Sequence, residues 1–380
     1  MDATKIMIVA GEASGDRHAA KLVEAIRALR PETEFFGSAG PLMRAAGVVP
    51  TVEADGLSIV GLAEIGRALP MFVKTMRTLR RAAEEQQPAV AVLVDFPDFN
   101  LKLAKHLKKL GIKVVYYISP QLWAWRQYRI STIKNSVDLL LTILPFEADW
   151  YAKRGVEHVE YVGNPLAREV HATRSREEFC ADHKLEPALP IVSLLPGSRS
   201  KEISRILPVM LDATLGISRV HPGAQFVVAL ADDRHLRMVR NLIAKLVPGT
   251  IAVTGETYDA LAASDAAMVT SGTATLEAGI IGTPMVIVYK TSAMNYKLLE
   301  PLIDVPHYGL INLIAGERLA TELIQGDLSA ETLGAETLGL LEPTRNAEVR
   351  VKLAAAAAKL GKGGASARAA DAVLRVMNQD

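Results

Sequence analysis

Short apolar runs alternate with amphipathic segments along most of the chain. In the first part, segments such as Arg17–Leu29 and Leu101–Leu110 have the spacing of helices that bury one face. Strand-length runs separated by such helices predict a parallel sheet that is covered on both faces. The strands predicted in this part are Ile6–Ala10, Ala89–Val94, Lys113–Ile118 and Leu139–Leu144.

The alternation pauses between Asn164 and Pro190, where the chain is polar and has no strong apolar run. It then restarts, so we expect an α/β protein with two doubly wound, Rossmann-like domains that face a ligand cleft. The expected ranges are 1–168 for the first domain, 169–345 for the second, and 346–380 for a C-terminal helix that crosses back to the first and has a break at Gly363-Gly364. The strands predicted in the second domain are Ile191–Leu195, Gln225–Leu230, Thr250–Val253, Ala266–Val269 and Met285–Tyr289.

The composition excludes several classes of protein. The 380 residues suffice for two apolar cores, and the net charge of +1 gives no general attraction to nucleic acid. Cys180 is the only cysteine, which rules out an intramolecular disulfide and fits a reducing compartment. We see no signal peptide ahead of the first strand and no apolar run of membrane-spanning length. We therefore expect a soluble or peripheral protein.

The segment from Asp265 to Glu277 carries the most chemical information. A predicted strand is followed by a turn of small residues and then by the start of a helix, where free N–H groups and the helix dipole favour an anion. Glu277, about one turn into that helix, could accept hydrogen bonds from two ribose hydroxyls. The pattern predicts a nucleoside diphosphate site, although an ordinary capped helix would look the same. The turn residues assigned to the donor are Ser271, Gly272, Thr273 and Thr275.

A second turn of this kind opens the second domain at Gly197-Ser198-Arg199. It places backbone donors and a guanidinium where a diphosphate could lie, so Ser198 and Arg199 are assigned to the donor. The alternative is an exposed loop arginine. Because no histidine or third acid stands at ligand spacing beside Asp95 and Asp98, we expect neither a metal nor another cofactor.

The loop Gly11-Glu12-Ala13-Ser14-Gly15-Asp16 follows the first strand and opens the first helix. Its glycines allow a close approach to the backbone, but the third glycine of the dinucleotide fingerprint is missing. Its two acids favour sugar hydroxyls, and the alternative is a tight turn with Asp16 as the N-cap. We assign Asp16 to the acceptor side or an interface. The donor-side residues of this loop are Gly11, Glu12, Ser14 and Gly15.

Two further loops follow strands of the first domain. In Asp95-Phe96-Pro97-Asp98-Phe99-Asn100, Asp98 is expected beside Phe99 and partly desolvated, where it could take a proton from an alcohol. A plain N-cap is the alternative reading of Asp98. In Ser119–Arg126, at least one of Trp123 and Trp125 should contact an interface, a sugar or an acyl chain, unless both form a structural corner. Arg126 offers a charge for a phosphate.

The stretch Ile65–Arg81 is apolar and basic and contains no acid. This composition suits a helix that lies on an anionic membrane or covers acyl chains. The alternative is an ordinary surface helix with a buried apolar stripe. The residues assigned to membrane or acyl contact are Met71, Phe72, Met76, Arg77, Arg80 and Arg81.

Taken together and in this order, seven segments resemble the lipid-A-disaccharide synthase family, whose members are glycosyltransferases of the GT-B fold. The similarity covers nearly the whole chain, and the seven segments in series make a strong signal. The segments are Gly11–Asp16, Asp95–Asn100, Ser119–Arg126, Leu144–Glu147, Leu194–Arg199, Ser271–Glu277 and Asn312–Gly316.

The resemblance implies that UDP-2,3-diacylglucosamine is joined to 2,3-diacylglucosamine 1-phosphate, giving the β-1,6-linked lipid A disaccharide. It also implies an inverting, metal-free reaction at the cytoplasmic face of the inner membrane of Gram-negative bacteria, whose anionic surface would be a partner. Asp98 would be the general base, Glu277 would hold the ribose, and Arg199 with the 271–275 turn would stabilise the departing UDP. Asn312 is expected near the diphosphate. A homodimer is compatible with the sequence.

Two departures and two rival functions qualify this reading. The chain has Asn164 where many members have a histidine, and Phe96 where some have a small residue. One rival is another enzyme of the same fold, such as a UDP-GlcNAc 2-epimerase or the glucosaminyltransferase of peptidoglycan synthesis, which should lack the segment Trp123–Arg126. The other rival is a non-catalytic UDP-sugar binding protein, which should tolerate loss of Asp98.

Overall fold

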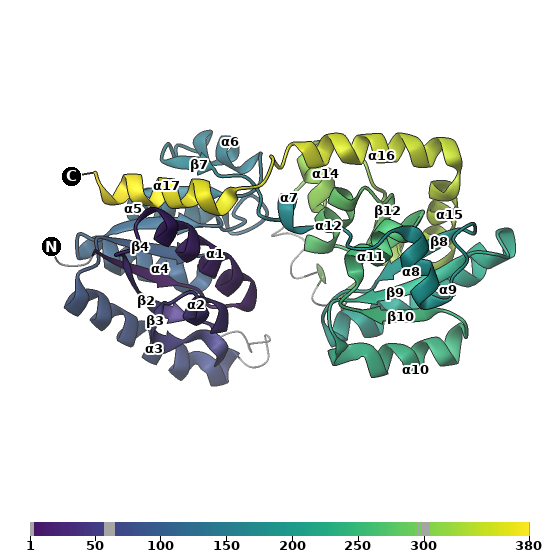
Figure 1. Ribbon diagram of the computed structural model, residues 1–380, viewed down its shortest axis with the longest axis horizontal. Coiled ribbons are helices and arrows are strands. Elements are labelled where there is room, and N and C mark those ends of the chain that lie inside the picture. The colour runs from purple at the N-terminus through teal and green to yellow at the C-terminus, as the bar shows by residue number, and fades with distance from the viewer. Residues whose placement is uncertain (1–3, 57–64, 293, 295, 298–304, 380) are drawn as a thin grey trace. The chain divides into compact units, whose positions relative to one another are not determined.

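The computed structural model describes residues 4–56, 65–292, 294, 296–297 and 305–379. The chain divides into two compact units. The first comprises Met1–Pro165 with Lys362–Asp380, and the second comprises Leu166–Gly361. Each unit contains its own parallel sheet with helices on both faces (Figure 1). The Rossmann-like arrangement expected from the alternating pattern is therefore present twice.

The sheet of the first unit has seven strands in the order β3-β2-β1-β4-β5-β6-β7, and every neighbouring pair is parallel. Four of these strands match the predicted apolar runs, and β2, β3 and β7 were not among them. The strands are β1 (Lys5–Val9), β2 (Glu34–Ala39), β3 (Val49–Glu53), β4 (Val90–Val94), β5 (Lys113–Tyr117), β6 (Leu139–Thr142) and β7 (Val159–Tyr161).

The helices of the first unit cover two separate apolar cores. Ile8 lies in one core with Leu22 of α1 and Val373 of α17, whereas the neighbouring Met7 lies in the other with Leu79 of α3. Successive strand residues point to opposite faces, which explains this division. The helices are α1 (Ala13–Leu29), α2 (Pro41–Ala45), α3 (Ile65–Gln86), α4 (Pro97–Lys109), α5 (Ile130–Ser136), α6 (Glu147–Ala152) and α17 (Ala365–Met377).

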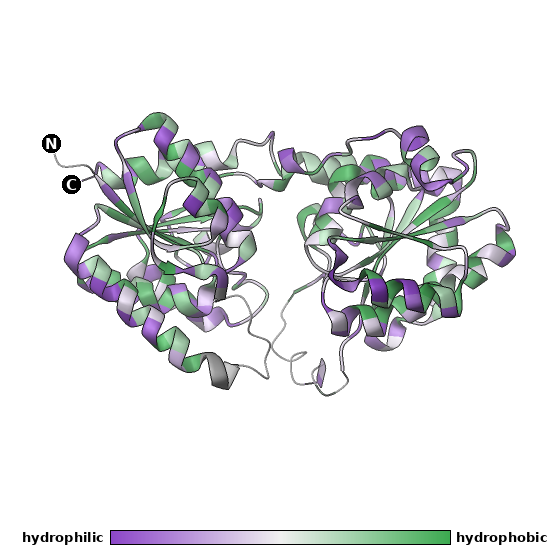
Figure 2. Ribbon diagram, turned by 60° about the horizontal axis from the view of Figure 1, so that its bottom comes forward, coloured by the Kyte–Doolittle hydropathy of each residue, from purple (hydrophilic) through white to green (hydrophobic). Residues whose placement is uncertain are grey.

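The sheet of the second unit has six parallel strands in the order β10-β9-β8-β11-β12-β13. They are β8 (Ile191–Leu195), β9 (Gln225–Leu230), β10 (Ile251–Thr254), β11 (Ala266–Thr270), β12 (Met285–Tyr289) and β13 (Glu322–Ile324). The helices are α7 (Leu166–Glu169), α8 (Arg176–His183), α9 (Ser200–Val220), α10 (Leu236–Leu246), α11 (Thr257–Ala263), α12 (Thr273–Ile281), α14 (Leu310–Ala315), α15 (Ala330–Leu341) and α16 (Pro343–Ala358). Figure 2 shows largely apolar strands between helices that alternate polar and apolar residues, as buried parallel sheets require.

The strand order locates the ligand edge of each unit. It reverses between β1 and β4 in the first sheet and between β8 and β11 in the second. In open α/β sheets, ligands bind beyond the carboxyl ends of the strands at such a switch point. Four of the loops singled out in the sequence follow these four strands, so the topology groups them in pairs.

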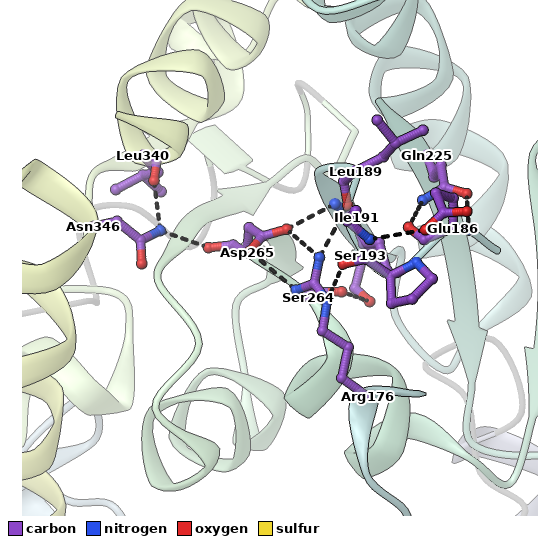
Figure 3. A network of polar contacts seen from close by, with 12 residues as sticks. Arg176, Glu186, Leu189, Ile191, Ser193, Gln225, Ser264, Asp265, Leu340 and Asn346 are labelled. Carbon is purple, nitrogen blue, oxygen red and sulfur yellow. Dashed lines mark hydrogen bonds and ion pairs between the residues drawn. The ribbon is translucent and has the colours of Figure 1, made fainter. Parts of the chain in front are cut away.

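A polar network around Asp265 holds the opposite, amino-terminal edge of the second sheet (Figure 3). The Asp265 carboxylate accepts hydrogen bonds from both terminal nitrogens of Arg176 at 3.0 Å and from the Ile191 N–H at 2.9 Å. Its backbone carbonyl accepts a bond from Asn346 Nδ2 at 2.8 Å. The network ties α8, β8 and α16 to the start of β11, and its place at the amino edge indicates a structural role.

The C-terminal segment is broken at the glycines expected from the sequence, Gly363 and Gly364. It forms two helices, α16 in the second unit and α17 in the first. Between them Gly361, Gly363 and Gly364 have φ values of 84°, 82° and 75°, in the left-handed region that glycine adopts readily and that ends a helix. Among the described residues, no helix is both long and apolar enough to cross a membrane.

Candidate active site

The turn after β4 is built from two residues in the left-handed region, Asp95 with φ 48° and Phe96 with φ 51°. This backbone directs the Phe96 ring toward the loop after β1. A Cβ on Gly11 would lie only 2.3 Å from Phe96 Cδ1, so glycine is required there. Phe96 also stacks on Phe99, with ring centroids 5.5 Å apart. Gly11 therefore accommodates a neighbouring loop, which is a sufficient reason for glycine at this position.

Asp16 does not lie free at the ligand edge, which corrects the assignment to an acceptor or an interface. It is buried within α1, and its two carboxylate oxygens accept hydrogen bonds from the Leu42 N–H at 2.9 Å and the Met43 N–H at 3.1 Å. Asp16 therefore caps the N–H groups in the first turn of α2, although it lies in another helix. The N-cap residue of α1 is Glu12, which is exposed along with Ser14, while Gly15 is buried.

Asp98 stands in the first turn of α4, and two arginines converge on it. Its Oδ1 accepts a hydrogen bond from Arg126 Nη1 at 2.8 Å and another from Arg129 Nη2. The expectation of a partly desolvated carboxylate beside Phe99 is wrong, because the Asp98 side chain is 64% exposed and Phe99 is buried. Sequence reasoning also missed Arg129, whose spacing of three residues from Arg126 was the available signal.

Asp95, at the carboxyl end of β4, is a second titratable group at this edge. Burial, with the negative charge of Glu12 as a smaller cause, raises the pKa of its carboxyl to about 6. The Tyr116 hydroxyl donates to the Asp95 backbone carbonyl at 2.6 Å and holds the turn in place. Asp95 was considered in the sequence only as a metal ligand. The structure gives it the perturbed pKa that is typical of functional carboxyls.

The two tryptophans after β5 have different surroundings. Trp123 is buried, and its Nε1 donates to Glu147 Oε1 at 2.9 Å, so it forms a structural corner and not an acceptor or interface residue. Trp125 is exposed, and the Arg126 guanidinium lies over its ring at 4.1 Å from the centroid. This corrects the assignment of Trp123 and leaves Trp125 and Arg126 at the surface beside Asp98.

In the second unit, the turn after β11 leads directly into α12. Gly272 is its N-cap with φ 143°, and the first helical N–H groups of an α-helix have no partner within the helix. The Ser271 hydroxyl donates to the Tyr308 carbonyl at 2.8 Å, whereas Gly272 and Thr273 are exposed. Thr275 is buried, with its hydroxyl bonded to the Gly272 carbonyl at 2.8 Å, so it shapes the turn and does not face a ligand.

Glu277 is half-buried one turn into α12, as the sequence predicted. Its Oε1 accepts a hydrogen bond from the Tyr258 hydroxyl at 3.1 Å. The carboxylate is thus held at the same edge as the exposed turn of Gly272 and Thr273. An anion site at the turn and an acceptor group one helical turn away is the arrangement expected for a diphosphate and a ribose.

Arg199 is the N-cap residue of α9, and its side chain is 82% exposed. Its Nη1 donates to Glu202 Oε1 at 3.1 Å. Gly197, with φ 101°, lies against Glu202, since a Cβ there would be 2.7 Å from Glu202 Oε2. Ser198 is exposed beside it. The exposed guanidinium and the start of a long helix at the switch point can both face an anion.

The Asn312 amide is held inside the second unit, and its expected place near the diphosphate stays a prediction. It is fully buried, and its Nδ2 donates to the Ala320 carbonyl and to Glu322 Oε1, both at 2.8 Å. Its Oδ1 accepts the Ala320 N–H at 2.8 Å. The amide therefore fastens α14 to β13. Glu322 in turn accepts the N–H groups of Tyr308 and Gly309, so Asn312 acts on the loop that contacts Ser271.

The basic helix α3 presents a different face from the one assigned in the sequence. Phe72 and Met76 pack against the core of the first unit, with Phe72 6.1 Å from Phe96 between ring centroids, so they are structural. Met71 and Arg80 are half-buried, and Arg81 pairs with Glu85 at 2.7 Å. The outer face forms a shallow groove of about 440 Å³, lined by Leu69, Pro70, Val73, Lys74, Arg77 and Thr78.

Comparison with known proteins identifies the family. Residues 6–376 match the family described as lipid-A-disaccharide synthetase. The lipid-A-disaccharide synthase of Syntrophus aciditrophicus (strain SB) is 42% identical over 100% of this chain and 99% of the relative. The chain belongs to the lipid-A-disaccharide synthase family. The enzyme of Myxococcus xanthus (strain DK1622) is also 42% identical, over 98% of this chain and 97% of its own. The chain is accordingly a glycosyltransferase of lipid A biosynthesis.

Solved structures agree with the fold. The UDP-GlcNAc 2-epimerase of Neisseria meningitidis, bound to UDP-GlcNAc, gives a TM-score of 0.65 at 12% identity and covers 98% of this chain and 100% of its own. The calicheamicin glycosyltransferase CalG4 gives a TM-score of 0.61 at 17% identity and covers 100% of this chain and 99% of its own. At these identities the likeness shows the fold alone, which confirms the GT-B prediction. The family match, and not the fold, separates the chain from the epimerases.

Asn164 replaces the histidine expected at its position. It is buried, and its Nδ2 donates to the Ile143 carbonyl at 3.1 Å, so part of its hydrogen bonding holds the end of β6. Within the part of the chain that the structure describes, no cluster of His, Cys, Asp or Glu side chains has the arrangement of a metal site.

Proposed function

We propose that the chain joins UDP-2,3-diacylglucosamine to 2,3-diacylglucosamine 1-phosphate, giving the β-1,6-linked lipid A disaccharide 1-phosphate and UDP. The family membership over residues 6–376 is the observation that carries this proposal. The donor's nucleotide binds the second unit, at the loops after β8 and β11. The acceptor binds the first unit, at the loops after β4 and β5.

The reaction is a single displacement with inversion. The acceptor 6-hydroxyl attacks the anomeric carbon of the donor, and Asp98 takes the hydroxyl proton as the bond to UDP breaks. Arg199 and the exposed N–H groups at the start of α12 stabilise the negative charge that develops on the diphosphate. Glu277 accepts hydrogen bonds from the ribose. No step in this scheme requires a metal ion.

The function is tested by incubating the protein with both diacylated substrates, with and without EDTA. Disaccharide 1-phosphate and UDP should form in equal amounts, and EDTA should leave the rate unchanged, because Arg199 and a helix N-terminus serve the diphosphate. If UDP-GlcNAc were epimerised and no disaccharide formed, the rival enzyme class would be correct. If activity were lost in EDTA and returned with magnesium, the metal-free scheme would fail.

The two donor contacts are expected to differ in what they recognise. Glu277→Ala should weaken the binding of both UDP and uridine, because it removes hydrogen bonds to the ribose. Arg199→Ala should weaken the binding of UDP but not of uridine, because it removes a contact to the diphosphate. Each loss should be on the order of tenfold, as for one hydrogen bond to a charged group. Calorimetry with both ligands separates the two. If both variants bound UDP as tightly as the parent does, the proposal that the nucleotide binds the second unit would be wrong.

We also propose that the protein is peripheral on the inner face of the inner membrane. Both substrates carry two acyl chains and must be met at a bilayer. The outer face of α3 combines exposed Leu69 and Val73 with Lys74 and Arg77. An apolar and basic face of this kind suits an anionic lipid surface, where each cation contributes about 1 kcal/mol that salt weakens.

Lys74→Ser with Arg77→Ser is expected to remove the salt-sensitive part of binding to anionic vesicles, and Leu69→Ser with Val73→Ser the part that survives salt. Sedimentation with vesicles at low and high salt measures both. The matched control is Lys102→Ser with Lys105→Ser, two exposed lysines on α4. If the α3 variants sediment like this control, α3 is only a structural helix and the membrane contact lies elsewhere.

A further inference from the structure

Two arginines and one aspartate of the first unit form ion pairs at the carboxyl edge of its sheet. Arg126 Nη1 and Arg129 Nη2 donate to the same oxygen of Asp98. The Arg129 side chain is 16% exposed, whereas that of Asp98 is 64% exposed. The carboxylate therefore lies on the solvent side of guanidinium groups that are themselves partly enclosed. The three groups together carry one excess positive charge.

Both guanidinium groups are held in place before any ligand arrives. The Arg126 guanidinium lies over the Trp125 ring, and the backbone of Arg126 is in the left-handed region with φ 54°, where the short helix Gln127–Arg129 begins. Arg129 lies 6.0 Å from the centroid of Tyr128. Asp98 sits in the first turn of α4, whose dipole adds positive potential at the same point. The arrangement is preorganised for a small anion.

We propose that Arg126 and Arg129 bind the phosphate of the acceptor, and that this phosphate displaces Asp98 from them and so frees the base. The proposal rests on the function proposed above and adds to it the site of the acceptor phosphate. The displaced carboxylate takes the proton of the 6-hydroxyl while the new bond to the donor's anomeric carbon forms and UDP leaves. No further reactant is needed.

The chemistry of the acceptor supports this arrangement. In a glucosamine 1-phosphate, carbons 1 and 5 flank the ring oxygen and carbon 6 is attached to carbon 5, so the phosphate and the 6-hydroxyl lie at the same end of the ring. Arginines that hold the phosphate therefore place the 6-hydroxyl close to the Asp98 carboxylate that the phosphate has displaced. A phosphate also offers more acceptor oxygens and more charge to arginine forks than one carboxylate does.

The resting ion pairs are easy to exchange. Asp98 is mostly exposed, and ion pairs of exposed groups contribute little net stability because water solvates both partners well. The same contacts keep the carboxylate occupied until the acceptor is present. Arg126 and Arg129 are in this scheme binding and positioning residues, and only Asp98 exchanges a proton with the substrate.

The first test uses two acceptors, one with the 1-phosphate and one with a hydroxyl in its place. Arg126→Gln with Arg129→Gln should lower kcat/KM for the phosphorylated acceptor by roughly tenfold to a hundredfold, as loss of charged hydrogen bonds does, and should change the phosphate-free acceptor little. Arg154→Gln is the matched control, because Arg154 also lies over a tryptophan, Trp150, at 4.0 Å. Equal losses on both acceptors would overturn the proposal.

The second test does not depend on catalysis. If Asp98 competes with phosphate for the two arginines, Asp98→Asn should bind water-soluble glucosamine 1-phosphate roughly tenfold more tightly than the parent does, because its neutral amide competes poorly. Calorimetry measures this, with glucosamine as the phosphate-free probe. Unchanged or weaker binding would contradict the displacement. Failure of the proposed function itself would appear separately, as absence of disaccharide product from the parent enzyme.

Discussion

Asp98→Asn is expected to lower turnover by roughly a hundredfold to ten-thousandfold, the usual contribution of a positioned general base. The amide keeps the size of the side chain and can still accept a hydrogen bond from Arg126, but it cannot take the proton of the 6-hydroxyl. UDP binding should stay close to that of the parent, because the loops proposed to bind the nucleotide belong to the second unit. Steady-state rates with both substrates, together with UDP calorimetry, make the comparison.

Asp55→Asn provides the matched control for this substitution. Asp55 is also an exposed aspartate paired with an arginine of the first unit, Arg44, at 3.0 Å, and its loss should leave turnover unchanged. If Asp98→Asn retained near-normal turnover, the base would have to be another carboxyl of this edge. Asp95, whose pKa is raised to about 6, and Glu12 would be the next candidates. Asp16 would not, since both its oxygens cap α2.

The fold could be predicted from the sequence because buried parallel strands have continuous apolar runs. β4 (Val90–Val94) and β8 (Ile191–Leu195) are buried along their whole length and were found directly. β3 (Val49–Glu53) is an edge strand whose residues are half-buried or exposed and include Pro50, so it carries no such signal. The break between α16 and α17 was predicted, because Gly363-Gly364 interrupts the helical spacing, and both glycines adopt left-handed conformations there.

The candidate site was only partly predictable, for a physical reason. The position of a loop after a central strand follows from local sequence, and Asp98, Glu277 and Arg199 lie at the expected carboxyl edges. The partner of a side chain does not follow from local sequence. Asp16 bonds to the backbone 26 residues away, and Trp123 bonds to Glu147 24 residues away. Because of these long-range hydrogen bonds, the Asp16 and Trp123 side chains, which were predicted to contact a ligand or an interface, have structural roles.

Glu147→Ala is expected to destabilise the first unit by about 1–3 kcal/mol, the usual cost of leaving buried hydrogen-bond donors without their acceptor. The Glu147 carboxyl is fully buried and accepts hydrogen bonds from Trp123 Nε1 at 2.9 Å, the Leu144 N–H at 3.0 Å and the Ile143 N–H at 3.3 Å. Truncation leaves these donors buried without their acceptor and opens a cavity. All three tryptophans of the chain lie in the first unit, so denaturant unfolding followed by tryptophan fluorescence reports on it.

The difference between parent and Glu147→Ala should also depend on pH in a defined direction. Burial raises the pKa of the Glu147 carboxyl from 4.5 to about 7 against the opposing effect of its donors. Proton uptake by the folded state therefore adds stability that is fully present below pH 4.5 and is lost as the pH rises to about 7. The loss in the variant should be largest at low pH and smaller at pH 8. Glu157→Ala, at an exposed position, is the control. A parent-like unfolding midpoint for Glu147→Ala at both pH values would show that the Trp123 corner is held without this carboxylate.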